Sequence, residues 1–168
     1  MKKKDFAVGE HVFYPTAGVG VLEAIEALYF GGERQEYYVI RVPNSAVTIK
    51  VPTQNAERNG LRPLLPGRRL KELFRVLGEK GTDGPAGHWA DRYKDLERRI
   101  QTGCCLQIGG VVRDLLRLKA DNGLSFEETR LLETAAGYLT HEVAAIEGIG
   151  LDVAAARIRE MVAGSGVS

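Results

Sequence analysis

Apolar and polar residues alternate in short runs over the first third of the chain, and turn-forming residues separate the runs. Residues 19–25 and 36–42 are strand-like, and Gly31 and Gly32 between them form a hairpin signal. Residues 47–51 alternate until Pro52 ends the run. Four or five short strands joined by tight turns predict a small curled sheet, of the kind found in SH3-like barrels, over residues 1–62.

The hydrophobic period becomes helical after Pro63 and Pro66. The first predicted helix has apolar residues at the spacing of one helix face, namely Leu70, Leu73, Phe74 and Leu77. A stretch rich in helix breakers, residues 81–88, then precedes a second helix that begins at Trp89 and ends near Gly103. The stripe of this helix contains Tyr93, Leu96 and Ile100.

Three more helices follow. The third ends at Gly123, and Gly109 and Gly110 inside it suggest close packing against another helix. Ser125 and Glu128 form a capping box that opens the fourth, and Asp152 is positioned to cap a short fifth helix. We therefore predict an α+β chain, with a small β barrel over residues 1–62 and an all-α bundle of about five helices over residues 67–164.

Composition narrows the class of protein. An apolar fraction of 44% and a charged fraction of 27% are typical of a globular protein. We expect a cytoplasmic location without membrane association, because no apolar run approaches the length of a membrane span or of a signal peptide core. The adjacent Cys104 and Cys105 suggest a reducing interior and are expected to be packing residues at a helix start.

The motifs of common enzymes are not found in the sequence. It contains no phosphate-binding loop, nucleophile elbow or paired carboxylates, and its three histidines are scattered without metal-ligand spacing. We therefore expect no enzymatic activity, no catalytic residues, no metal or other cofactor, and no small-molecule ligand.

Charge is unevenly distributed along a chain whose net charge is +1. Residues 89–120 carry seven basic and four acidic residues, whereas residues 121–168 carry three and eight. This asymmetry suggests a face for a polyanion, although charged runs are more often solvated surfaces. Within the basic segment, Trp89 opens a helix with cations one turn away. It is either a core residue packed on Leu70 or Phe74, or a wedge for nucleic acid.

Several segments resemble the CarD/CdnL family of bacterial transcription regulators. In the first module these are VGEHVFYP (residues 8–15), GVG (18–20), EYYVIRV (36–42), IKVP (49–52), Asn55 and GLR (60–62). In the helical module they are WADRYK (89–94), VVRDL (111–115) and LSFEE (124–128). The resemblance covers about residues 5–162, in the order and spacing of the family.

The resemblance implies a transcription regulator with two modules. The N-terminal module would be Tudor-like and would bind the RNA polymerase β subunit, largely by adding one sheet edge to another. The helical module would contact promoter DNA at the upstream edge of the transcription bubble. There, a tryptophan wedge in the minor groove would stabilise the open complex.

Carried over residue by residue, the resemblance gives two sets of expected contacts. Trp89, Arg92, Lys94 and Arg98 would contact DNA, with Arg92 on a phosphate and Lys94 secondary, unless these cations are simply exposed or paired within the helix. Val39, Lys50 and Pro52 would lie near the polymerase, unless Val39 is ordinary core and Pro52 an ordinary strand terminator. Asp91 departs from the family pattern, which has a basic or polar residue there in many members. Leu28 stands where some members have a basic contact residue.

Two alternatives stay open. The helical module could bind another regulator as a protein–protein adaptor of the transcription machinery. The protein could also be a free-standing DNA-binding repressor, but its near-neutral charge favours DNA binding that is supported by polymerase.

Overall fold

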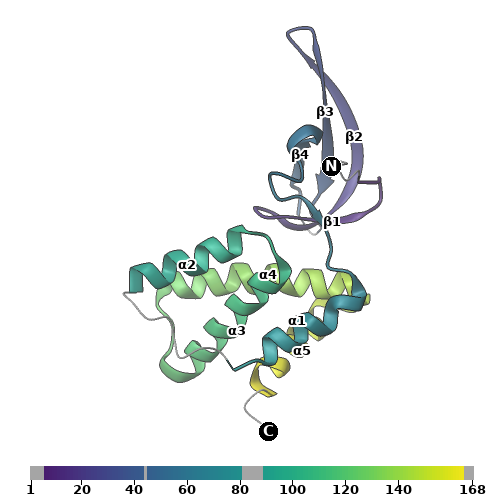
Figure 1. The fold of residues 1–168 in the computed structure, drawn as a ribbon. Coiled ribbons are helices and arrows are strands. Elements are labelled where there is room, and N and C mark those ends of the chain that lie inside the picture. The colour runs from purple at the N-terminus through teal and green to yellow at the C-terminus, as the bar shows by residue number, and fades with distance from the viewer. Residues whose placement is uncertain (1–5, 44, 81–88, 165–168) are drawn as a thin grey trace. The chain divides into compact units, whose positions relative to one another are not determined.

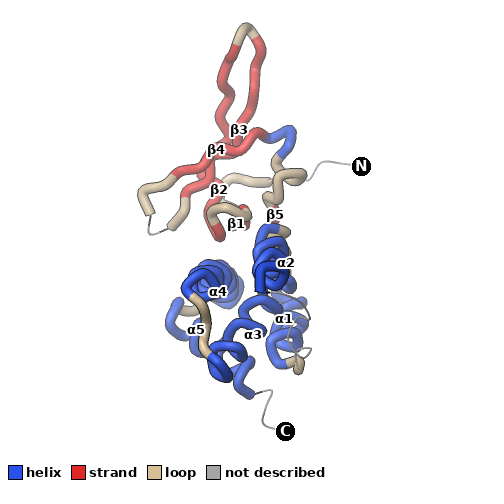
Figure 2. Tube along the Cα trace, turned by 90° about the vertical axis from the view of Figure 1, so that its left-hand side faces the viewer, coloured by secondary structure: helices blue, strands red, loops and turns tan. Residues whose placement is uncertain are grey.

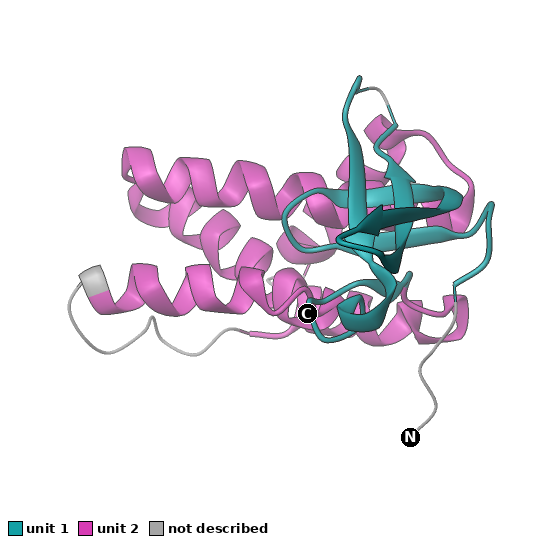
Figure 3. Cartoon of the chain, turned by 90° about the horizontal axis from the view of Figure 1, so that it is seen from above, with its two compact units in different colours: residues 1–64 teal, residues 65–168 magenta. Residues whose placement is uncertain are grey.

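The chain forms two compact units, residues 1–64 and 65–168 (Figure 3). The computed structural model describes residues 6–43, 45–80 and 89–164, and the side chains of all of these except Trp89 and Ala90. Within these ranges, strands occur only in the first unit and α-helices only in the second (Figure 1). The predicted α+β class, with five α-helices after the sheet, is confirmed.

The first unit is built on one antiparallel sheet with the strand order β4-β3-β2-β1-β5 (Figure 2). Its strands are β1 (His11–Tyr14), β2 (Gly18–Phe30), β3 (Glu33–Arg41), β4 (Thr48–Pro52) and β5 (Arg62–Pro63), and a 3-10 turn, η1 (Thr53–Asn55), follows β4. The small sheet was predicted, but the barrel is a correction, because the edge strands β4 and β5 do not pair with each other and the sheet stays open. With only two residues, β5 offers little backbone for closure.

The β2–β3 hairpin extends well beyond the predicted strands. Gly31 and Gly32 have φ of +58° and +85°, which suits the tight turns that match strand twist. From Ala24 and Val39 onward, the pairing continues to Phe30 and Glu33 beside this turn. The outer part of the hairpin forms a two-stranded arm (Figure 1), on which Tyr29 and Phe30 are exposed.

One face of the sheet carries the core of the first unit. A β-bulge between Leu22 and Ala24 interrupts the β2–β3 register and keeps Leu22 opposite Ile40. The ring of Phe6 packs edge-on against Tyr38, with centroids 5.5 Å apart. The buried residues of this cluster are Phe6, Val12, Leu22, Tyr38, Ile40, Val51, Ala56 and Leu61.

The second unit is a bundle of five α-helices that follow a 3-10 turn, η2 (Gly67–Arg69). The helices are α1 (Leu70–Gly78), α2 (Trp89–Gln101), α3 (Cys105–Asn122), α4 (Phe126–Glu147) and α5 (Leu151–Gly164). Each helix buries an apolar face, and α3 lies among the others, packing against α1, α2, α4 and α5. No described helix is long and apolar enough to cross a membrane.

The helix ends follow the predicted capping residues with one exception. Ser125 and Glu128 form the capping box of α4, and Gly123, at φ +78°, ends α3. Asp152 lies in the first turn of α5 instead of capping it. Of the two cysteines, Cys105 is buried at the start of α3 as predicted, whereas Cys104 is exposed.

Gly109 and Gly110 allow two neighbouring side chains to approach the backbone of α3. A β-carbon at Gly109 would lie 2.7 Å from Leu73 Cδ1 of α1. One at Gly110 would lie 2.5 Å from Arg99 Nη2 of α2. The predicted close packing is therefore confirmed, and it accounts for two residues that disfavour the helix.

Candidate functional site

Helix α2 carries all four residues predicted to contact DNA. Trp89 is its first residue, and the Trp89 side chain and the preceding residues 81–88 lie outside the described part. Leu96 and Ile100 are buried and Tyr93 is half-buried, so the predicted stripe faces the bundle. The helix is therefore held against α3 and α4 along one side, and its other side is open to solvent.

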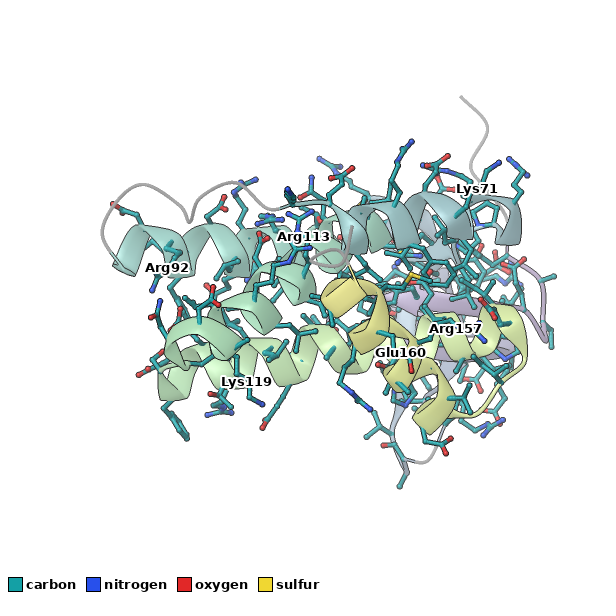
Figure 4. The ribbon with its side chains drawn as sticks, turned by 90° about the horizontal axis from the view of Figure 1, so that it is seen from below. Lys71, Arg92, Arg113, Lys119, Arg157 and Glu160 are labelled. Atoms are coloured by element: carbon teal, nitrogen blue, oxygen red, sulfur yellow. The ribbon has the colours of Figure 1, made fainter. Side chains whose placement is uncertain are left out.

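The three basic residues of α2 differ in their surroundings. Arg92 has only 26% of its side chain exposed and donates from Nη2 to Glu128 Oε2 on α4, at 3.2 Å. Figure 4 shows Arg92 on the side of α2 that faces the neighbouring helices. Arg98 is 68% exposed and pairs with Asp95 at 2.6 Å. Lys94 is exposed and forms no ion pair with any residue whose side chain is described.

Helix geometry separates these cations into two directions. Arg92 and Lys94 are two residues apart and diverge by about 200°, whereas Lys94 and Arg98 are four apart and share a face within about 40°. Asp91 is exposed in the first turn, where a carboxylate suits the helix dipole. The more exposed candidate cations of α2 are therefore Lys94 and Arg98, which share one face of the helix.

Sequence reasoning missed an arginine network between α3 and the last turn of α1. Arg113 of α3, 12% exposed, donates to Asp114 at 2.9 Å and to the carbonyl oxygen of Val76 at 3.0 Å. Arg117 donates to the carbonyl oxygen of Leu77 at 3.4 Å, and burial, followed by the charge of Arg113, lowers its pKa. These guanidinium groups satisfy carbonyls in the last turn of α1 and so stabilise that helix end.

The predicted polymerase contacts lie on and beside the edge strand β4. Lys50 forms an ion pair with Glu26 of β2 at 3.1 Å, and both side chains are about half exposed. Val39 of β3 lies opposite Lys50 in the register and is only 5% exposed, so its side chain offers little surface to a partner. Pro52 is half-buried and is the last residue of β4.

The backbone of β4 has one open side. The N–H of Val42 donates to the carbonyl of Val47 at 3.2 Å, which fixes the phase of hydrogen bonding between β3 and β4. Because bonded and non-bonded pairs alternate in an antiparallel ladder, Ile49 and Val51 bond to β3. The N–H and carbonyl groups of Thr48 and Lys50 therefore point away from β3, and no described strand pairs with them.

The described residues contain no cluster of metal ligands. Within these ranges, no group of three or more His, Cys, Asp or Glu side chains could hold a metal ion. Tyr93 is half-buried on the stripe that faces the bundle, which agrees with its prediction as a packing residue.

Comparison with known proteins identifies the chain. Residues 6–65 match the family model for the CarD-like/TRCF RID domain, and residues 72–159 match the model for the CarD C-terminal domain. A relative from Bacillus subtilis (strain 168), named "Putative transcription factor YdeB", is 35% identical over 144 residues. That match covers 86% of this chain and 94% of the relative. The chain belongs to the CarD/CdnL family, and it is a CarD-like transcription factor, not an enzyme.

Proposed function

We propose that this transcription factor binds the β subunit of RNA polymerase through β4 and stabilises the open promoter complex through α2. One observation carries the proposal: the open backbone edge of β4 lies within the segment that matches the CarD-like/TRCF RID domain. An open edge permits strand addition, in which backbone hydrogen bonds supply affinity and neighbouring side chains supply selectivity. Val39, Lys50 and Pro52 lie on β4 or directly beside it.

The second half of the proposal concerns α2 and promoter DNA near the upstream fork of the bubble. Lys94 and Arg98 supply a small basic face, and Trp89 at the start of the helix would wedge between bases in the minor groove. Arg92 would contribute little to phosphate binding while it pairs with Glu128. A weak, sequence-tolerant contact suffices if polymerase holds the protein at the promoter.

Thr48 offers a direct test of the polymerase contact. Thr48→Pro removes an outward N–H but no hydrogen bond to β3, and Pro is tolerated at the first residue of an edge strand. Loss of one intermolecular backbone bond, plus the rigid ring, should weaken polymerase binding roughly threefold to tenfold. Thr48→Val keeps the N–H and is the matched control.

Binding would be measured with the full chain and purified polymerase, alongside urea denaturation of each variant. Equal polymerase affinity of Thr48→Pro and Thr48→Val, with both folded, would exclude strand addition at β4.

Trp89→Ala tests the second half of the proposal. It should shorten the open-complex lifetime by roughly fivefold or more, because base–aromatic stacking contributes about 1–3 kcal/mol per base.

The adaptor alternative has one observation in its favour, namely that two of the three candidate cations of α2 are already paired within the protein. An adaptor predicts that Trp89→Ala leaves the open-complex lifetime unchanged. It also predicts that polymerase binding through β4 is retained, so the two experiments separate the two functions.

A further inference from the structure

Glu128 is a buried carboxylate that joins two helices. It is 4% exposed, and its two oxygens have different partners. Oε1 accepts from the backbone N–H of Ser125 at 3.1 Å, which closes the capping box at the start of α4. Oε2 accepts from Arg92 Nη2 of α2 at 3.2 Å. One side chain therefore completes the N-terminus of α4 and binds the first part of α2.

The environment of this pair favours a fixed geometry. A buried carboxylate is costly without a cation, and its Oε1 is held in place by the capping box. Arg92 is about three-quarters buried, so it has little freedom to leave the pair while the helices stay packed. Its Nε is also buried and finds no hydrogen-bond partner among the described residues. Because Arg92 is mostly buried even though its Nε is left without a partner in the described part of the chain, we take its ion pair with Glu128 to determine where the guanidinium lies.

The position of Arg92 along α2 determines which part of the helix the Arg92–Glu128 pair holds. Arg92 follows Trp89 by three residues, so the two belong to the same turn. The first backbone N–H groups of a helix have no partner within it, and helix ends fray unless other contacts hold them. Leu96 and Ile100 attach the later turns of α2 to the bundle, and the Arg92–Glu128 pair, together with half-buried Tyr93, attaches the first.

We infer that Glu128 is a positioning residue for the Trp89 wedge, which it orients through Arg92 and the first turn of α2. The inference rests on the proposed function at promoter DNA. It also assigns Arg92 a role that differs from the phosphate contact expected from the sequence. Arg92 holds the wedge, and the phosphate contact passes to Lys94 and Arg98.

Glu128→Gln separates the two tasks of the side chain. Glutamine retains an oxygen for the N–H of Ser125, as capping boxes allow, but it removes the charge that pairs with Arg92. Ser125→Ala is the matched control, because it weakens the cap of α4 and leaves the Arg92–Glu128 pair in place. Glu128→Gln should shorten the open-complex lifetime on the order of threefold to tenfold, and Ser125→Ala should not.

Fluorescence supplies a readout that needs neither polymerase nor DNA. Trp89 is the one tryptophan of the chain, so its anisotropy and its quenching by acrylamide report on the start of α2 alone. Glu128→Gln should lower the anisotropy and increase the quenching relative to the unmodified chain. Ser125→Ala should match the unmodified chain in both. Equal fluorescence of Glu128→Gln and the unmodified chain would overturn the inference.

Arg92→Gln distinguishes positioning from direct DNA contact. If Arg92 acts only with Glu128, Arg92→Gln, Glu128→Gln and the double variant shorten the lifetime equally. If Arg92→Gln shortens the lifetime and Glu128→Gln does not, Arg92 contacts DNA and the inference is wrong. The double variant leaves no unpaired buried charge, so it supports the test where a single variant unfolds.

Trp89→Ala separates failure of this inference from failure of the proposed function. An unchanged lifetime in Trp89→Ala contradicts the wedge itself, whatever Glu128 does. A shortened lifetime in Trp89→Ala, with normal lifetimes in folded Glu128→Gln and Arg92→Gln, contradicts only the positioning of the wedge by Glu128.

Discussion

Asp91 is the residue of α2 whose charge opposes the proposed DNA contact. It is exposed in the first turn, two residues from Trp89, and DNA phosphates repel a carboxylate. Asp91→Asn should therefore lengthen the open-complex lifetime by roughly twofold to fivefold at low salt, and the gain should shrink as salt screens the charge. Stability should fall by less than about 1 kcal/mol, because the helix dipole loses one favourable charge.

Glu97→Gln is the matched control for Asp91→Asn. Glu97→Gln removes the same charge from the same helix, but Glu97 lies about 240° around the helix axis from Asp91 and so on a different face. If both variants lengthen the lifetime equally, the effect comes from net charge and not from Asp91 beside the wedge. The two variants are compared by their open-complex lifetimes, measured at two salt concentrations.

Gly109 shows how one missing side chain sets helix spacing. Gly109→Ala would place a methyl group 2.7 Å from Leu73 Cδ1, and Leu73 is fully buried. Overpacking of this kind costs about 1–3 kcal/mol, against a helix propensity gain of up to about 1 kcal/mol. We expect a net loss of stability, measured by urea denaturation.

Gly137 in α4 is the matched control for this prediction, because a β-carbon there meets no atom within 4 Å. Gly137→Ala should stabilise the protein by about 0.5–1 kcal/mol. A stabilising effect of both substitutions would show that the Leu73 side chain can move away from α3 at no cost.

At the scale of elements, local signals predicted the helices well. Ser125 with Glu128 predicted the start of α4, and Gly123 predicted the end of α3, because each cap satisfies backbone groups within a few residues. The turn at Gly31 and Gly32 was predicted because glycine readily adopts the positive φ that a tight hairpin turn requires. The flanking strands were predicted too short, because residues 26–30 pair through the register of the hairpin and not through an apolar pattern of their own.

Two features could not be predicted from local patterns. Whether the sheet closes depends on the distance between β4 and β5, which follow one another in the chain but lie at opposite edges of the sheet. The pairing of Arg92 with Glu128 links residues 36 apart in the chain. Glu128 carried a capping signal, but nothing in the sequence indicated that its second oxygen would bind α2. The sequence therefore located the candidate helix but not the partners of its charges.

For the whole molecule, net charge limits the ways in which it can bind DNA. A net charge of +1, with few unpaired cations described on α2, releases few counterions from duplex DNA. We predict no stable complex with duplex promoter DNA alone at physiological salt, and a complex when polymerase is present. A gel shift with and without polymerase checks this, and tight binding to duplex DNA alone would favour a free-standing repressor.

The bond between Glu142 and Leu65 has a consequence for binding two partners at once. The N–H of Leu65, the first residue of the helical unit, donates to Glu142 Oε2 of α4 at 2.8 Å, and Glu142 is 1% exposed. Since β5 ends at Pro63, Leu64 alone separates the last paired residue of the sheet from this anchor. A short covalent link between two binding modules raises the effective concentration of the second module at its own site, into the millimolar range or above. A DNA contact too weak to form in free solution would then be well occupied.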